Sequence, residues 1–254
     1  MNKWRFLPLE VRNAYMNMAI DEAILRARIK NLVPNTVRLY RWNPSAVTIG
    51  YFQSLELEVD TNATKKMGVD VTRRITGGGA VYHDYNGEIT YSTIALIDNR
   101  TIPRDLIESY RKICSGIIFA LRKFSIEADF RPYNDIIVGN RKISGSAQTR
   151  KGNILLQHGT LLIDVDVDTM FTLLKVPNEK IRDKIVQSVK ERVTSMKTLL
   201  GYKPDFDDVA KSLKKGFEDA LEVTLIEDEL TEYEKKLADE LMKKYSDIKW
   251  IGLR

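Results

Sequence analysis

The sequence predicts an α+β domain in which mostly antiparallel and mixed sheets pack against helices. Three observations predict this class. Short segments of alternating apolar residues recur between residues 36 and 162, amphipathic segments with helical periodicity lie among them, and the sequence from about 168 to 254 is helical and highly charged. The 254 residues, 43% of them hydrophobic, suffice for one main core, so we expect one domain over residues 1–254.

The first helix is predicted between Asn13 and Leu32, where apolar residues recur at intervals of three and four. Asp21 and Glu22 fall between these apolar positions, and we expect both to be solvated. Two strands follow, TVRLYRW and SAVTIGY. The Asn43-Pro44 pair between them indicates either a β-hairpin or two adjacent strands.

Strands are also predicted on both sides of three consecutive glycines. A short helix from Asp60 to Met67, closed by Gly68, precedes the strand VDVTRR. The segments AVYHD and GEITYSTIALI follow the glycines and flank Asn86-Gly87, a dipeptide typical of hairpins. We therefore expect these two segments to be strands joined by a tight turn.

The second half of the chain is predicted to alternate between helix and strand. A long amphipathic helix begins after Pro103 and is expected to lie on the sheet. Three β segments follow, DIIVG, NRKISGSAQ and NILLQHGTLLIDV, with turns at Gly139-Asn140 and Lys151-Gly152. Charged helices and one short strand, EVTLI, complete the chain, and Thr231 and Glu234 have the spacing of a capping box.

The composition excludes several classes of protein. No apolar run is long enough to span a bilayer and the first residues lack a secretory signal pattern, so we expect a cytoplasmic protein without a membrane partner. One cysteine, Cys114, and two histidines exclude a disulfide framework and leave too few ligands for structural zinc. The net charge of +5 is spread among acidic residues, which favours an acidic protein or ligand as partner over nucleic acid.

The run RRITGGGAVYHD, residues 73–84, is the main candidate for a site. Three glycines in a row indicate a backbone that turns sharply or closely approaches another group. The run has neither the ending of a P-loop nor the spacing of a dinucleotide-binding fingerprint, and strand rather than helix is expected after it. Bare amides flanked by two guanidinium groups suit a phosphorylated or elongated ligand.

This run resembles the signature of the lipoate-protein ligase A family. The segments MNMAIDEAIL, NDIIVGNRKISGSAQTR and NILLQHGTLLIDVD resemble further family blocks in the same order, so the resemblance extends from about Trp4 to Thr194. It implies the biotin/lipoate-protein ligase fold, which is similar to class II synthetases. It also implies an enzyme that uses ATP and Mg²⁺ to convert lipoate to lipoyl-adenylate and then transfers the lipoyl group to a carrier lysine.

The resemblance also implies protein partners. The family modifies lipoyl domains of 2-oxoacid dehydrogenase E2 subunits and the glycine-cleavage H protein. The chain is too short for the full C-terminal domain of single-chain bacterial ligases. It therefore resembles the two-piece archaeal form, in which the accessory domain is a separate subunit required for adenylate formation, and its own residues from about 168 to 254 are expected to form a helical C-terminal segment.

The matching blocks imply roles for individual polar residues. Lys142 would neutralise charge beside the phosphate and acyl oxygens; otherwise it is a solvated strand lysine. Arg74 would face phosphate or ligand, whereas Arg73, its neighbour on a strand, is expected to point to the opposite side. Asn134 and Asp135 would contact the adenylate, with Asp135 a candidate magnesium ligand, or else form a polar strand entry.

The glycines and histidines of these blocks complete the predicted site. Gly77, Gly78 and Gly79 would pack against the lipoyl tail and the adenylate; without a ligand they form a tight turn. His83 and His158 would contact the ligand or hold the surrounding loops, and the alternative is that each is a satisfied strand histidine. Both interpretations remain open for each histidine.

Two other functions remain as alternatives to the ligase. Related octanoyl transferases use an active-site cysteine, which one branch with the GSAQTR and LQHG blocks carries shortly before the segment matching NDIIV. The corresponding ADFRPYNDI contains none, and Cys114 lies on the apolar stripe of the long helix, which favours adenylation. An ATP-independent octanoyl or lipoyl transferase and a non-catalytic lipoate-binding module are the alternatives. Residues 175–196 are expected either to cover the ligand, with Lys180 or Arg192 near phosphate, or to form an ordinary surface helix.

Overall fold

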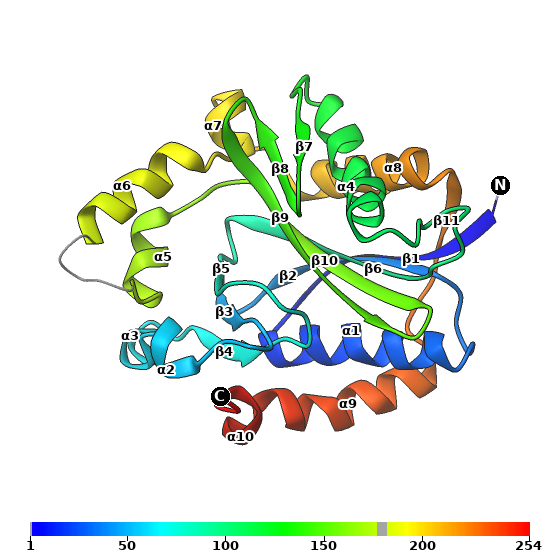
Figure 1. Cartoon of the computed structure of the whole chain (residues 1–254), viewed down its shortest axis with the longest axis horizontal. Helices are drawn as coiled ribbons and strands as arrows, with labels where there is room; N and C mark the ends of the chain where they lie inside the picture. The colour runs from blue at the N-terminus through cyan, green and yellow to red at the C-terminus, as the bar shows by residue number, and fades with distance from the viewer. Residues whose placement is uncertain (1, 177–181) are drawn as a thin grey trace.

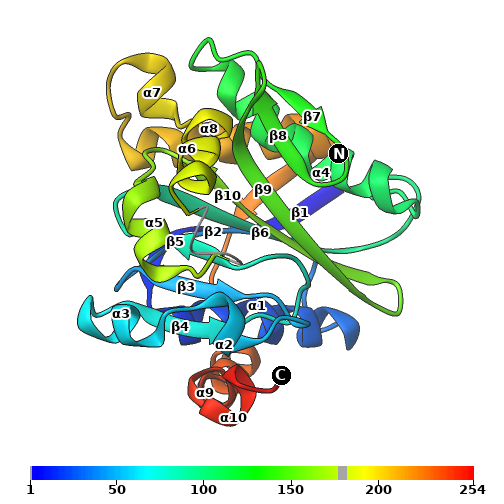
Figure 2. The same ribbon diagram turned by 60° about the vertical axis from the view of Figure 1, so that its left-hand side comes forward.

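The computed structural model describes residues 2–176 and 182–254, over which the chain forms a large and a small sheet enclosed by helices (Figures 1 and 2). Neighbouring strands of the large sheet follow the order β11 (Val223–Glu227), β1 (Asn2–Arg12), β2 (Thr36–Trp42), β6 (Glu88–Leu96), β10 (Ile154–Leu162), β9 (Arg141–Lys151), β8 (Asp135–Val138) and β7 (Asp129–Arg131). Strands β11 and β2 run parallel to β1, and the other neighbours pair antiparallel. The predicted α+β class with mixed sheets is confirmed.

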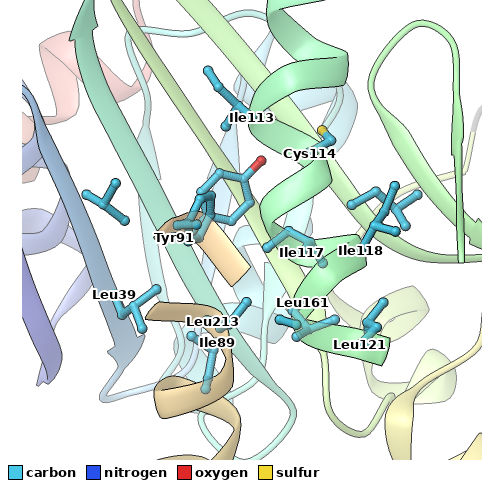
Figure 3. Close-up of a cluster of buried hydrophobic side chains, with 14 of the residues drawn as sticks. Leu39, Ile89, Tyr91, Ile113, Cys114, Ile117, Ile118, Leu121, Leu161 and Leu213 are labelled. Atoms are coloured by element: carbon cyan, nitrogen blue, oxygen red, sulfur yellow. The ribbon is translucent and has the colours of Figure 1, made fainter. Parts of the chain in front are cut away.

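Helices cover both faces of the large sheet (Figure 1). Helix α1 (Ala14–Ile29) packs on one face with α9 (Glu232–Ser246) along its outer side, and α4 (Leu106–Arg122) and α8 (Phe206–Leu221) pack on the other face. Ile113, Ile117 and Leu121 of α4 are fully buried against the sheet, as its apolar stripe predicts (Figure 3). The remaining helices are α2 (Leu55–Glu58), α3 (Thr61–Lys66), α5 (Val167–Leu173), α6 (Arg182–Arg192), α7 (Met196–Leu200) and α10 (Ile248–Ile251). No helix in the described ranges is long and apolar enough to span a membrane.

Helix α1 is buried on more sides than its sequence suggests, because α9 packs along it. Asp21 and Glu22 are only 2% and 5% exposed, so the prediction that both are solvated is wrong. Each carboxylate instead has a cationic partner. Arg38 donates to Asp21 at 2.9 Å, and Lys244 of α9 donates to Glu22 at 2.7 Å. Asp21 also lies 3.3 Å from Nδ1 of His158 on β10.

The predicted strands flanking Asn43-Pro44 and Asn86-Gly87 exist, but neither pair forms a hairpin. Strand β3 (Ala46–Ile49) leaves β2 and pairs with β4 (Asp70–Arg73) and β5 (Val81–His83) in the small sheet. Strand β6 likewise leaves β5 and returns to the large sheet. The reason is that β2 and β6 are interior strands with both edges already paired, so neither can accept a hairpin partner. The glycine run joins β4 to β5 of the small sheet, and a Cβ at Gly78 would lie 3.9 Å from Ala147 of β9 in the large sheet.

The C-terminal residues are built into the main domain rather than attached beside it. Strand β11 adds to the edge of the large sheet next to β1, and α8 packs against α4. The predicted capping box is present: the Thr231 hydroxyl accepts a hydrogen bond from the Glu234 amide, and the Glu234 carboxylate accepts one from the Thr231 amide. Strands β1 and β7 were not predicted.

Candidate functional site

A cavity of about 350 Å³ lies between the two sheets, beside the glycine run. Both sheets and helices α1, α5 and α6 contribute to its wall. Its apolar lining includes Met18, Trp42, Val81, Leu162, Val167, Met170, Val189 and Val193. Its polar lining includes seven residues predicted to form the site: Arg74, Gly78, Gly79, His83, Asn134, Lys142 and His158. A cavity with an apolar wall and a few polar groups suits an elongated ligand with one charged end.

The glycine run forms its loop by packing backbone against backbone. A Cβ at Gly50, at the end of β3, would lie 2.0 Å from the carbonyl oxygen of Gly78, so only glycine permits this approach. Gly78 has φ +95°, a conformation that favours glycine. Gly78 and Gly79 line the cavity, whereas Gly77 lies outside its wall, near Phe52. Gly50 was not predicted as part of the site, because a single glycine after a strand is too weak a signal.

Arg74 holds the glycine loop instead of projecting freely into the cavity. Its Nη2 donates to the carbonyl oxygens of Gly77 and Gly79 at 2.8 and 2.7 Å. Burial lowers the pKa of Arg74 to about 10, and no described carboxylate forms an ion pair with it. Its charge is therefore available to attract an anionic ligand through space. Arg73 points the opposite way, as predicted, and donates to backbone carbonyls that include Ile251 of α10.

Both histidines lie at the cavity wall, and both ring nitrogens of each have partners. His83 contacts Glu88 through Nδ1 at 2.7 Å and stacks on Trp42 with a centroid distance of 4.1 Å. His158 contacts Asp21 through Nδ1 at 3.3 Å. Burial lowers the pKa of His158, an effect that its contact with Asp21 only partly offsets, which favours the neutral imidazole. Neither ring has a free nitrogen for proton transfer.

The side chain of Lys142 passes close to Gly145 and lines the cavity. The bulge where β8 pairs with β9 lies next to it, and a Cβ at Gly145 would be 2.6 Å from its Nζ. Nζ lies 2.6 Å from Oδ1 of Asp135, with side chains 42% and 28% exposed, but the contact lacks hydrogen-bond alignment. Asp135 does not itself line the cavity. Asn134 does, and its amide group donates to the Ser146 carbonyl.

Part of the wall comes from the segment for which ligand covering and an ordinary surface helix were the two alternatives. Val189 of α6 and Val193 just beyond it line the cavity, and Val193 forms a β-bridge with Lys142. The amide of Thr194 donates to the Lys142 carbonyl at 2.8 Å, which fixes the end of this segment to β9. Arg192 is exposed, and Lys180 lies outside the described residues.

Cys114, the one cysteine of the sequence, is buried on α4 within the apolar cluster drawn in Figure 3. Its sulfur lies 3.6 Å from the Ser146 hydroxyl and the Gln157 amide. Burial raises its pKa to about 11, so the thiol stays protonated at neutral pH. It does not line the cavity.

The acidic residues offer limited support for a protein-held metal ion. Within residues 2–176 and 182–254, no three His, Cys, Asp or Glu side chains cluster in a way that would hold one. The predicted ligand Asp135 is in contact with the Lys142 ammonium. Mg²⁺ commonly binds through one or two carboxylates together with substrate phosphates, and Asp135 fits only that kind of site.

Comparison with known proteins gives consistent matches. Residues 13–218 match the lipoyl protein ligase A/B catalytic domain. The chain is 37% identical to the octanoyltransferase LipM of Clostridioides difficile (strain 630), covering 97% of both chains. A bipartite lipoate protein ligase from Thermoplasma acidophilum, described with its E2 lipoyl domain, is similar in structure with a TM-score of 0.88, 34% identity and coverage of 100% of this chain and 98% of that chain. A lipoate-protein ligase A bound with ATP gives a TM-score of 0.85 at 32% identity, covering 100% of both chains.

Proposed function

This chain belongs to the lipoyl protein ligase A/B catalytic domain family, and we propose that it attaches a lipoyl or octanoyl group to a lysine of a lipoyl domain. The volume and apolar lining of the cavity support an eight-carbon acyl chain as ligand. Each buried methylene contributes roughly 0.8 kcal/mol, so the chain can supply several kcal/mol of binding energy.

The proposed route is ATP-dependent, through lipoyl-adenylate. Two observations support this route. The Lys142 ammonium lines the cavity, whereas the Cys114 thiol, which a covalent transfer would need, is buried outside the cavity and has a raised pKa. In the first step the lipoate carboxylate attacks the α-phosphate of ATP and pyrophosphate leaves. In the second step the carrier lysine attacks the acyl carbon and AMP leaves. Lys142 is placed to stabilise the negative charge that develops in both steps.

Asp135 has a supporting role in this proposal. It holds the Lys142 ammonium at the cavity wall until an anionic ligand competes for it. Mg²⁺, bound with the nucleotide phosphates, would supply charge neutralisation and orient the leaving pyrophosphate. The residues of this chain exclude water from the acyl carbon through the apolar segments of β5, α5 and α6.

Octanoyl transfer without ATP is the second candidate function. The octanoyltransferases among the sequence relatives favour it over the ligase, and the identity extends over nearly the whole chain. Acyl transfer from a thioester donor would place the octanoyl chain in the same cavity and release a thiol. A covalent route would need a nucleophile there, and Cys114 does not reach the cavity. The names of the relatives thus favour a thioester as acyl donor, whereas the residues of the cavity favour an acyl-adenylate. The proposed acceptor, a lysine of a lipoyl domain, is the same for both.

The proposed partners follow from the same comparison. The Thermoplasma acidophilum protein is bipartite and is described with its E2 lipoyl domain. We infer a lipoyl domain as acceptor and a separate accessory subunit as a requirement for adenylate formation.

The discriminating experiment supplies each donor separately. The purified chain is incubated with an apo lipoyl domain and either lipoate, ATP and Mg²⁺, with and without a candidate accessory subunit, or an octanoylated carrier thioester without ATP. Intact mass of the lipoyl domain reports acylation, and pyrophosphate release reports adenylation. Acylation that requires ATP supports the ligase, and acylation from the thioester alone replaces it with the transferase. Binding of lipoate without acylation in any condition indicates a binding module.

A further inference from the structure

Arg74 is the end of a hydrogen-bond chain that begins at a buried carboxylate of α1. Its Nε lies 3.1 Å from the hydroxyl of Thr76, to which it donates. The same hydroxyl lies 2.7 Å from Nε2 of His158, whose Nδ1 faces Asp21 at 3.3 Å. All four residues are at most 7% exposed. Arg74 is therefore linked to Asp21 through an imidazole and a hydroxyl.

A second chain of the same composition reaches Arg74 from the large sheet. Its Nη1 donates at 3.1 Å to the hydroxyl of Thr48, which lies 2.9 Å from Nε2 of His83. Nδ1 of His83 contacts Glu88 at 2.7 Å. Both histidines of the sequence thus occupy equivalent positions, each between a carboxylate and a threonine hydroxyl.

The direction of each hydrogen bond follows from the number of protons available. A carboxylate accepts, so each Nδ1 carries the imidazole proton. Each threonine hydroxyl accepts from Arg74 and can donate its own proton to the Nε2 of its histidine.

The third nitrogen of Arg74 connects the two chains to the cavity. Nη2 donates to the carbonyl oxygens of Gly77 and Gly79, on either side of Gly78. The glycines have no side chains to hold their own position, so these two hydrogen bonds add to the packing of Gly50 against Gly78 in fixing the loop. A planar guanidinium fixed at Nε and Nη1 has only one orientation for Nη2.

We propose that Thr48 and Thr76 are positioning residues for the acyl site: their hydroxyls orient Arg74, and Arg74 orients the glycine loop at the cavity. The activity part of this inference rests on the proposed function; the position of the loop does not. Loss of the Thr76 hydroxyl is expected to have the larger effect, because Thr76 is the partner of Nε, whereas Nη1 keeps a second bond at 3.1 Å to the backbone carbonyl of Thr48.

The chain offers a matched control in Thr36. Its hydroxyl is also buried and also accepts from an arginine Nε, that of Arg5, at 3.1 Å, but it does not line the cavity or contact the glycine loop. Thr36→Val removes the same kind of hydrogen bond as Thr76→Val. Any general cost of burying an unpaired arginine nitrogen is therefore common to both variants.

The test combines hydrogen–deuterium exchange of peptides covering residues 76–80 with the acylation rate, both measured well below the melting temperature. In Thr76→Val we expect loop exchange at least tenfold faster and kcat/KM at least tenfold lower. Thr48→Val should change in the same direction by less, and the serine variants at both positions should resemble the wild type. Thr36→Val should leave both quantities unchanged.

Loop exchange in Thr76→Val and Thr48→Val equal to that in Thr36→Val would overturn the inference, whatever the activities. A wild-type chain that acylates no carrier, with faster loop exchange in Thr76→Val and Thr48→Val, would refute the proposed function and leave the positioning of the loop in place. Serine variants as impaired as the valine variants would also overturn it, because they keep the hydroxyls.

Discussion

Gly145→Ala tests the position of Lys142 without removing its charge. A Cβ at residue 145 would lie 2.6 Å from both Cε and Nζ of Lys142. Ordinary carbon contacts begin near 3.5 Å, so the ammonium must move by about 1 Å. This displacement takes it away from the position beside Asp135 from which it reaches the cavity.

The expected cost to stability is small and the expected cost to activity is large. The ion pair between Lys142 and Asp135 is partly exposed, and such pairs contribute about 0–1 kcal/mol, which corresponds to a Tm change of up to about 4 °C. A misplacement of about 1 Å in a catalytic group can cost roughly 100-fold in rate. We therefore expect Gly145→Ala to lower kcat about 10- to 100-fold, and Lys142→Ala to lower it about 100- to 1000-fold.

The assay is acylation of a lipoyl domain followed by intact mass, with melting temperature measured on the same samples. Gly145→Ala in a Lys142→Ala background should add no further loss, because both changes act through one ammonium. Full activity in Gly145→Ala, or a further loss in the double variant, would show that the position of Lys142 is not what the glycine protects. Unchanged activity in Lys142→Ala would remove the role of the lysine itself.

The loop, the thiol and a buried histidine each give a further expectation. Gly50→Ala forces a Cβ to within 2.0 Å of the Gly78 carbonyl oxygen, a backbone atom, so we expect a loss of roughly 1–3 kcal/mol in urea unfolding; a variant as stable as the wild type would contradict this packing. Cys114→Ser should keep acylation within about twofold, because the thiol is protonated and outside the cavity; loss of activity would place the sulfur in the reaction. Burial lowers the pKa of His158, so between its unfolded value of about 6.5 and its lower folded value the unfolded state binds more protons, and stability should fall as pH falls. Urea titrations from pH 7 to 5 should show a weaker slope in His158→Gln, and an unchanged slope would rule out this histidine as its source.

Local elements were predictable because their signals are local. The periodicity of α4, the turns around β9 and the capping residues of α9 involve residues within a few positions of one another. Strand pairing was not predictable in the same way. Asn86-Gly87 has the composition of a hairpin turn, but β6 finds two long partners in β2 and β10, and these outweigh the preference of the dipeptide.

The site residues likewise include some that the sequence predicts and some that it does not. Lys142, Gly78 and Arg74 belong to sequence blocks and were found from them, and all three line the cavity. Asp21 and Thr48 were missed, because their contacts are with residues 137 and 35 positions away. Their sequence surroundings are those of an ordinary helix and an ordinary strand.

The adjacent arginines that face opposite ways have a mechanical consequence. The guanidinium of Arg73 donates hydrogen bonds to the carbonyls of Trp250 and Ile251 in α10. The Trp250 indole in turn donates to the Arg73 carbonyl at 2.8 Å. The next residue, Arg74, donates hydrogen bonds to the glycine loop. A displacement of α10 would therefore be transmitted to the glycine loop beside the cavity through a single peptide unit.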